Sequence, residues 1–293
     1  MSLLIRYNPA SNIWSINVYI TQPVPLSRHL LQLTSFKYKT RKGPDYRHGD
    51  QVSFIDIKET FGIGGIRIGK WVNKEEKDLA ANLIFDSLAD LAFILALPPS
   101  AIGLRGNLNI AFGTGGRKGV QAHYAPNQRE LALAKNAGAG ALAHEFWHAF
   151  DHYIAEKAFD IGDRSGPQRK TIFASDCWLQ NADHFPHPLN ERLLKIFDAT
   201  LLTPDGQDRH DYVSRSVKAD QAMGSSYFSQ PTEMMARAFE AVVESCSGIE
   251  NAYLVSGTTK PDTLPLYPDI AHRHVINDAL QTYFRPLGDA LSR

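Results

Sequence analysis

Residues 138–154 read GAGALAHEFWHAFDHYI, and this stretch decides the predicted fold. Two histidines, His144 and His148, stand four residues apart, and Glu145 follows the first of them. On an α-helix, residues four apart lie on one face about one turn apart, so both imidazoles can point at one metal ion. Tetrahedral zinc sites take two ligands from such a helix. Glu145 can then act as the general base on a zinc-bound water.

The surroundings of this HExxH motif favour a metal site over a chance match. With the His and Glu content of the chain, a chance match is expected with a probability of only about 0.015. A predicted strand hairpin, 120–124 with 130–133, comes directly before the helix, as the zinc-peptidase layout requires. The helix itself is apolar and well delimited; it carries Ala141, Leu142, Phe146, Ala149, Phe150 and Ile154.

The third ligand distinguishes the classes of zinc peptidase. A metzincin would carry Gly and His where this chain has Asp151 and Ile154, so that class is excluded. A gluzincin takes a glutamate from a later helix, and Glu233, in the first turn of a predicted amphipathic helix at 231–244, fits this role. The alternative is an ordinary first-turn glutamate favoured by the helix dipole. Glu240, seven residues further on the same face, is the second candidate.

Three further residues are candidates for supporting roles. Asp151 follows His148 by three residues, so it can orient an imidazole, serve as a ligand in place of Glu233, or be solvated. A zinc hydrolase also needs a group that stabilises the oxyanion. Tyr227 and Arg237, which flank Glu233 in the sequence, are the candidates for it. Core packing of Tyr227 and a surface ion pair of Arg237 are the alternatives.

The remaining periodicity predicts an α+β fold. A helix begins at a capping box of Asn73 and Glu76 and ends before Pro98. Residues 159–190 are rich in Asp, Pro and Gly and predict a long excursion. Strands are predicted at 13–20, 52–57 and 64–71, and further helices at 189–201, 231–244 and 271–283. We expect a zincin-like fold of the gluzincin type: a mixed sheet with strand 120–124 at the edge over the cleft, an active-site helix, and C-terminal helices.

Composition restricts the class of protein. Of 293 residues 43% are hydrophobic, and 31 basic side chains balance 31 acidic ones. The chain is therefore not disordered, and it has no global charge that would favour nucleic acid or an anionic membrane. Two cysteines are too few for a secreted disulfide scaffold. Arg6 interrupts the apolar core that a signal peptide needs, and no apolar run could span a membrane. We expect a cytoplasmic protein without a membrane partner.

The even balance hides an asymmetry. Residues 1–50 carry seven basic and two acidic side chains, a net charge of +5, which leaves −5 on the remainder. Within them, residues 36–47 (FKYKTRKGPDYR) interleave basic and aromatic residues, a pattern that can bind nucleic acid, although a solvated loop is the favoured interpretation. We expect residues 1–57 to form a β-rich accessory segment and 58–293 to form the catalytic domain. A function of the basic segment, if it has one, would be docking or substrate choice.

Three runs of the sequence resemble a known family: AFGTGGRKGVQAHYAP (111–126), KNAGAGALAHEFWHAFDHY (135–153) and YFSQPTEMMARAFEA (227–241). They are similar to the first large polyvalent-protein-associated domain, a zincin-like family of phages and conjugative elements whose stand-alone bacterial relatives carry the label CLCA-X. The resemblance covers roughly residues 60–285. Departures at 114–116 and in the order of Phe146 and Trp147 touch none of the candidate ligands. The family is regarded as metallopeptidases, which implies the same roles for the motif and for Glu233.

Together these observations predict zinc-dependent hydrolysis of peptide bonds in a protein or peptide substrate. One zinc ion would be held by His144, His148 and Glu233, and Glu145 would activate the water. The competing class is a catalytically silent zincin-like protein that binds or regulates a partner linked to mobile elements. Hydrolysis of a non-peptide amide would use the same centre.

Overall fold

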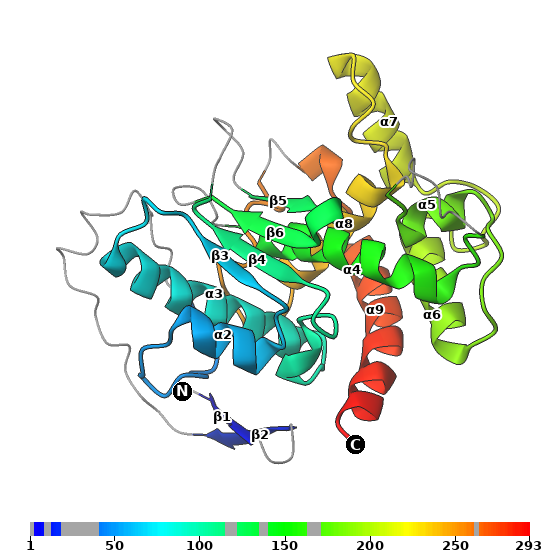
Figure 1. Cartoon of the computed structure of the whole chain (residues 1–293). Coiled ribbons are helices and arrows are strands. Elements are labelled where there is room, and N and C mark those ends of the chain that lie inside the picture. The colour runs from blue at the N-terminus through cyan, green and yellow to red at the C-terminus, as the bar shows by residue number, and fades with distance from the viewer. Residues whose placement is uncertain are drawn as a thin grey trace. The chain divides into compact units, whose positions relative to one another are not determined.

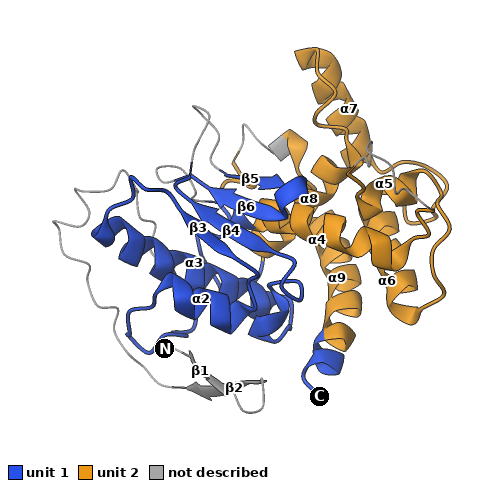
Figure 2. Cartoon of the chain, viewed as in Figure 1, with its two compact units in different colours: residues 1–142, 246–256, 288–293 blue, residues 143–245, 257–287 orange. Residues whose placement is uncertain are grey.

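The computed structural model describes residues 3–8, 13–18, 41–114, 122–134, 140–162, 171–260 and 264–293 (Figure 1). The described residues hold eight α-helices and a four-stranded mixed sheet, which confirms the α+β class. The chain divides into two compact units (Figure 2). Unit 1 comprises residues 1–142, 246–256 and 288–293, and unit 2 comprises residues 143–245 and 257–287.

The sheet of unit 1 has the strand order β3-β4-β6-β5. Its strands are β3 (Ile66–Ile68), β4 (Asn109–Phe112), β6 (Glu130–Leu133) and β5 (Ala122–Ala125). Strands β3 and β6 run parallel to β4, whereas β5 pairs with β6 in antiparallel register. The strand predicted in 64–71 and the predicted hairpin are confirmed, although residues 120 and 121 lie outside the described part. A separate hairpin pairs β1 (Leu3–Asn8) with β2 (Ile13–Val18), where a strand was predicted at 13–20.

Helix α3 (Lys74–Ile94) begins as the sequence predicts. The side chain of Asn73 accepts a hydrogen bond from the backbone N–H of Glu76 at 2.9 Å, and the carboxylate of Glu76 accepts one from the N–H of Asn73 at 3.1 Å. This capping box satisfies two backbone donors that the helix itself leaves unpaired. The predicted apolar face is buried in the core of unit 1; it includes Ile84, Leu88 and Leu91.

The prediction of a strand at 52–57 is wrong, because residues 54–61 form helix α2 (Phe54–Phe61). Ser53 caps this helix in a second capping box with Asp56. Phe54, Ile57 and Phe61 are buried at helical spacing. The alternating letters of VSFIDI resemble a strand, but the helix start signal and burial in tertiary packing decide the structure. Helix α2 spans the boundary predicted between residues 57 and 58.

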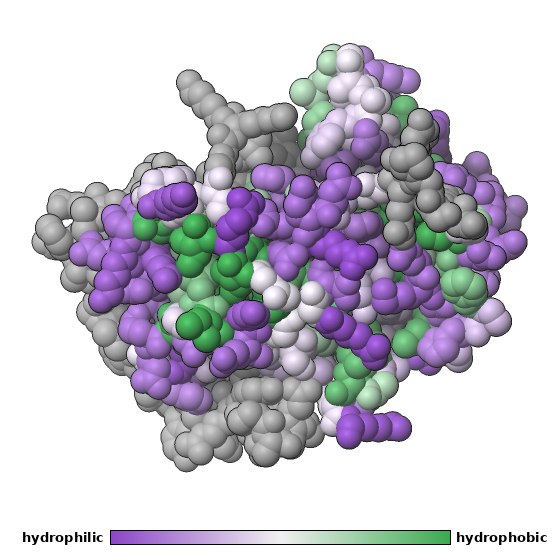
Figure 3. Space-filling model, in the orientation of Figure 1, coloured by the Kyte–Doolittle hydropathy of each residue, from purple (hydrophilic) through white to green (hydrophobic). Residues whose placement is uncertain are grey.

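The opposite side of α2 faces solvent. Ile55 in this helix is 67% exposed. In the view of Figure 3 the surface is largely hydrophilic, and hydrophobic residues gather over the part of unit 1 that contains α2 and β3. None of the helices in the described part of the chain combines the length and hydropathy needed to cross a bilayer.

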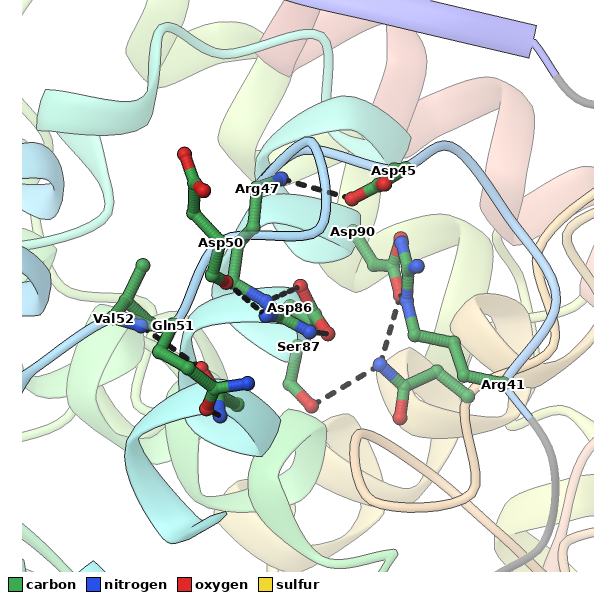
Figure 4. A network of polar contacts seen from close by, with 11 residues as sticks. Arg41, Asp45, Arg47, Asp50, Gln51, Val52, Asp86, Ser87 and Asp90 are labelled. Atoms are coloured by element: carbon green, nitrogen blue, oxygen red, sulfur yellow. Dashed lines mark hydrogen bonds and ion pairs between the residues drawn. The ribbon is translucent and has the colours of Figure 1, made fainter. Parts of the chain in front are cut away.

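Two arginines hold the segment 41–52 against α3 (Figure 4). Arg41 donates to both carboxylate oxygens of Asp90, at 2.8 and 2.6 Å, and Arg47 donates to both oxygens of Asp86, at 2.9 Å. Such bidentate pairs are among the strongest charged hydrogen bonds. The Asp90 side chain is fully buried, so its negative charge depends on Arg41 and on the amide of Asn251, which donates to it at 2.8 Å.

These ion pairs alter the interpretation of the basic stretch at 36–47. Arg41 and Arg47 are engaged within unit 1, and Lys42 pairs with Glu250 at 2.8 Å. The described part of the stretch is thus partly buried and ion-paired, where a solvated loop was expected, and residues 36–40 lie outside the described residues. Binding of nucleic acid by this stretch stays an untested prediction.

We predict that Arg41→Met lowers the free energy of unfolding by about 3 kcal/mol, because it leaves the buried Asp90 carboxylate without its cation. Urea denaturation followed by circular dichroism measures this change. Lys42→Met is the matched control: both side chains of its ion pair are 66% exposed, so the loss should stay below about 1 kcal/mol. Equal effects of the two substitutions would contradict the assignment.

Unit 2 is built of helices. They are α4 (Leu142–Ala158), α5 (Ala174–Leu179), α6 (Pro188–Leu201), α7 (Asp211–Met223), α8 (Pro231–Glu244) and α9 (Ile270–Leu291). The helices predicted at 189–201 and 231–244 are confirmed, and those predicted at 141–154 and 271–283 are confirmed but extend further at their C-terminal ends. The excursion predicted at 159–190 contains α5, and α7 was not predicted. The buried face of α7 consists of Tyr212, Ser216 and Asp220, so no apolar periodicity marks it.

A stacked pair of histidines joins three of these helices. The rings of His210 and His272 are 3.6 Å apart between centroids. His272 is 5% exposed, and its Nε2 donates to the carbonyl oxygen of Ala199 at 2.9 Å. Its Nδ1 is buried and has no hydrogen-bond partner among the described residues. Burial is the main cause that lowers the pKa of His272 to about 4, and the nearby His210 adds to it, whereas Asp269 opposes it.

This arrangement predicts that unit 2 loses stability in weak acid. Because the unfolded chain takes up a proton near pH 6.5 and the folded His272 only near pH 4, the stabilisation is present above pH 6.5 and is lost as pH falls toward 4. The free energy of unfolding is measured in urea with a metal chelator. As the pH is lowered from 6.5 to 4, it should decrease less in His272→Gln than in the parent. Parallel pH profiles would show that His272 does not carry this dependence.

Candidate metal centre

Helices α4 and α8 bring the three predicted ligands together. Nε2 of His144 and Nε2 of His148 lie 3.1 Å apart. The carboxylate of Glu233 has one oxygen 3.4 Å from Nε2 of His144 and the other 3.3 Å from Nε2 of His148. Within the described part of the chain, these residues form the one cluster of His, Cys, Asp or Glu side chains that could share a metal ion. We call them the ligand triad.

The geometry of the ligand triad fits zinc. With zinc–ligand bonds of about 2.0–2.1 Å, the corners of a tetrahedron lie about 3.3 Å apart. The two Nε2 atoms are 3.1 Å apart, and each lies 3.3–3.4 Å from a different oxygen of Glu233, so small side-chain movements would bring the three ligands around one ion. One oxygen of Glu233, Oε2, is buried and has no hydrogen-bond partner among the described residues. A buried carboxylate oxygen without a partner is costly, and a cation between the three side chains would satisfy it. Two imidazoles and a carboxylate are also a donor set that zinc prefers.

The electrostatics of the triad favour a positive charge at its centre. Burial alone would lower the pKa of His144, but the adjacent carboxylates of Glu233 and Glu240 raise it to about 10. Burial alone would raise the pKa of Glu233, but the adjacent imidazoles of His144 and His148 lower it well below its usual range. The protein therefore keeps a carboxylate here together with either a proton or a metal ion. Because a metal ion must displace this proton, the affinity of the triad for the metal should decrease as the pH is lowered.

Glu240 orients His144 from the side away from the other ligands. Nδ1 of His144 lies 3.0 Å from Oε1 of Glu240, and the hydroxyl of Tyr267 donates to the same oxygen at 3.0 Å. A carboxylate oxygen accepts, so Nδ1 carries the proton and Nε2 is available to a metal. The structure thus places Glu240 in a supporting position. Tyr267 was not found in the sequence, because no local spacing links it to the motif.

Asp151 is buried and engaged with α5. Its two oxygens accept hydrogen bonds from the backbone N–H and the hydroxyl of Ser175, at 2.8 and 2.6 Å. Burial raises the pKa of Asp151 to about 6, although the bonds from Ser175 oppose this shift. Its position joins α4 to α5, and its charge also acts on His148.

The two candidates for stabilising an oxyanion occupy different environments. Tyr227 is 49% exposed and lies near enough to Glu233 to interact with it electrostatically. Burial of the hydroxyl and the nearby Glu233 carboxylate raise the pKa of Tyr227, so the phenol stays protonated at neutral pH. Arg237 is 4% exposed and donates to the carbonyl oxygen of Phe228. Tyr227 therefore combines access to solvent with proximity to the triad, and Arg237 supports the loop before α8.

Glu145 lies on α4 beside the first ligand. It is 9% exposed, and it is near enough to interact electrostatically with His144 and Tyr227. The predicted base, the predicted ligands and the accessible tyrosine thus come together in unit 2. Strand β5, predicted to lie over the cleft, belongs to unit 1, and that placement stays a prediction.

Residues 219–291 match the family model of large polyvalent protein-associated domain 1. This match supports the family resemblance over a quarter of the chain. The matched region begins near the end of α7 and contains Tyr227, Glu233, Arg237, Glu240 and Tyr267, whereas the HExxH motif precedes it. No curated protein and no solved structure gives a significant match.

We predict that Glu240→Gln weakens zinc binding by roughly 10- to 100-fold, because the amide can turn a donor toward His144 and no longer fixes its tautomer. Competition with a chromophoric chelator measures the dissociation constant. Glu191→Gln, an exposed change in α6, is the control and should bind zinc like the parent. An unchanged constant for Glu240→Gln would remove Glu240 from the site.

Proposed function

We propose that the protein is a zinc-dependent metallopeptidase with a gluzincin-type fold. The observation that carries this proposal is the convergence of His144, His148 and Glu233 at the spacing of zinc ligands, with Glu145 next to the first of them. The order of elements along the chain supports it too, because an antiparallel hairpin precedes the HExxH helix and the glutamate comes from a later helix.

In this proposal the ligand triad would hold one zinc ion. A bound zinc ion supplies Lewis acidity, which polarises the scissile carbonyl and makes a water molecule acidic enough to attack at neutral pH. The side chains of the protein would orient the ligands of the ion, stabilise the developing oxyanion and transfer the protons.

Glu145 is the proton carrier of the proposed reaction. It accepts a proton from the attacking water and passes it to the leaving amine, as a carboxylate within reach of both groups can. Its burial limits competition from bulk water. Tyr227 keeps its proton and can donate a hydrogen bond to the oxyanion that develops on the carbonyl. Glu240 holds the His144 imidazole in the tautomer that leaves Nε2 free.

The proposed substrate is a protein or peptide. A cleavage screen with a peptide library should show zinc-dependent activity in the parent. In Glu145→Gln, which keeps the ligand triad, we expect zinc to be retained and cleavage to fall by roughly 10²- to 10⁴-fold.

The control for metal dependence is His144→Ala, which should lose both zinc and cleavage. Identical background cleavage in the parent and in Glu145→Gln would contradict peptidase activity. If the parent nevertheless held one zinc ion, a silent binding or regulatory protein would be the better account.

A further inference from the structure

Asp220 is a buried carboxylate that no catalytic step above uses. It lies in the last turn of α7, is 5% exposed, and accepts hydrogen bonds from three consecutive backbone N–H groups. The N–H groups of Tyr227 and Phe228 bind its Oδ1 at 2.9 Å each, and that of Ser229 binds its Oδ2 at 2.7 Å. The hydroxyl of Ser225 donates to Oδ1 at 2.5 Å.

These contacts fold residues 225–229 around one carboxylate. Hydrogen bonds to an ionised acceptor are shorter and roughly twice as strong as neutral ones, so three adjacent backbone donors on one carboxylate fix the loop strongly. The loop has no regular hydrogen-bond ladder of its own that could replace them. Its conformation therefore depends on a residue that lies seven positions before Tyr227.

The other end of the loop is held from α8. Arg237, one turn after Glu233, donates to the carbonyl oxygen of Phe228, and its guanidinium lies 5.5 Å from the centre of the Phe228 ring. The loop is thus fixed by an anion on α7 and by a cation on α8. Tyr227 stands between these two anchors, half exposed and near enough to Glu233 to interact with it electrostatically.

We propose that Asp220 is a positioning residue: by collecting the backbone N–H groups of residues 227–229, it holds Tyr227 beside Glu233 and so orders a ligand of the metal centre. This inference rests on the proposed function, because it gives Tyr227 and Glu233 the roles assigned there. Asp220 itself contacts neither the triad nor a substrate in this account.

A double-mutant cycle on zinc affinity tests the inference. The variants are Asp220→Asn, Tyr227→Phe and the double variant, with Asp278→Asn, an exposed change on α9, as the control. Since both single changes should loosen the same ligand, each should raise the zinc dissociation constant about tenfold, and the double variant should be no worse than either. A purely structural role for Asp220 would give additive effects, and so would overturn the proposal, as would a parent-like constant in Asp220→Asn.

Amide hydrogen exchange in the presence of a chelator provides a readout that needs neither metal nor activity. In Asp220→Asn the amides of residues 227–229 should exchange at least about tenfold faster, while those of α4 keep their protection. Unchanged exchange at 227–229 would overturn the proposal. If the parent bound no zinc, the proposed function would fail, and the exchange result alone would then decide whether Asp220 fixes the loop.

Discussion

The Glu233 carboxylate, buried against two imidazoles, is the interaction on which the structure of the centre depends. Two Nε2 atoms 3.1 Å apart repel one another through their lone pairs unless a proton or a cation lies between them. The carboxylate supplies the negative charge that makes this positive charge favourable. Helices α4 and α8 must approach closely to allow it, and they do so through the contact of Trp147 with Phe239, whose ring centres are 4.9 Å apart.

The triad is surrounded by polar supports that each act on a different ligand. Glu240 and Tyr267 fix the tautomer of His144. In the proposal above, Asp220 holds the loop of residues 225–229 and with it Tyr227 beside Glu233. These supports come from α7, α8 and the segment before α9, all of them within unit 2. Buried polar groups specify one arrangement only when they are fully satisfied, so a cation that engages Oε2 of Glu233 would complete a rigid centre.

The parts of the site that follow local rules could be predicted from the sequence. His144 and His148 share a helix face by spacing alone, Glu233 was recognisable in a first helical turn, and the capping box fixed the start of α3. Tyr267 could not be found, because a contact made 27 residues from Glu240 depends on how the chain folds back. The same holds for Asp220, which looks like an ordinary helical carboxylate in the sequence.

Two errors in the fold have specific causes. The segment 52–57 alternates like a strand, yet the Ser53 cap and the burial of Phe54 and Ile57 make it part of a helix. Helix α7 escaped detection because its buried face is polar, and that same face supplies the carboxylate that holds Tyr227. Rules based on apolar periodicity overlook such helices, and in this protein the overlooked helix supports the candidate site.

The central claim is that the ligand triad holds a single zinc ion. Anomalous diffraction at the zinc absorption edge from crystals of the zinc-loaded protein tests it most directly. The account predicts one peak per chain, about 2.1 Å from Nε2 of His144, from Nε2 of His148 and from an oxygen of Glu233. A peak elsewhere, or none at the triad under conditions where the protein is saturated with zinc, would contradict it.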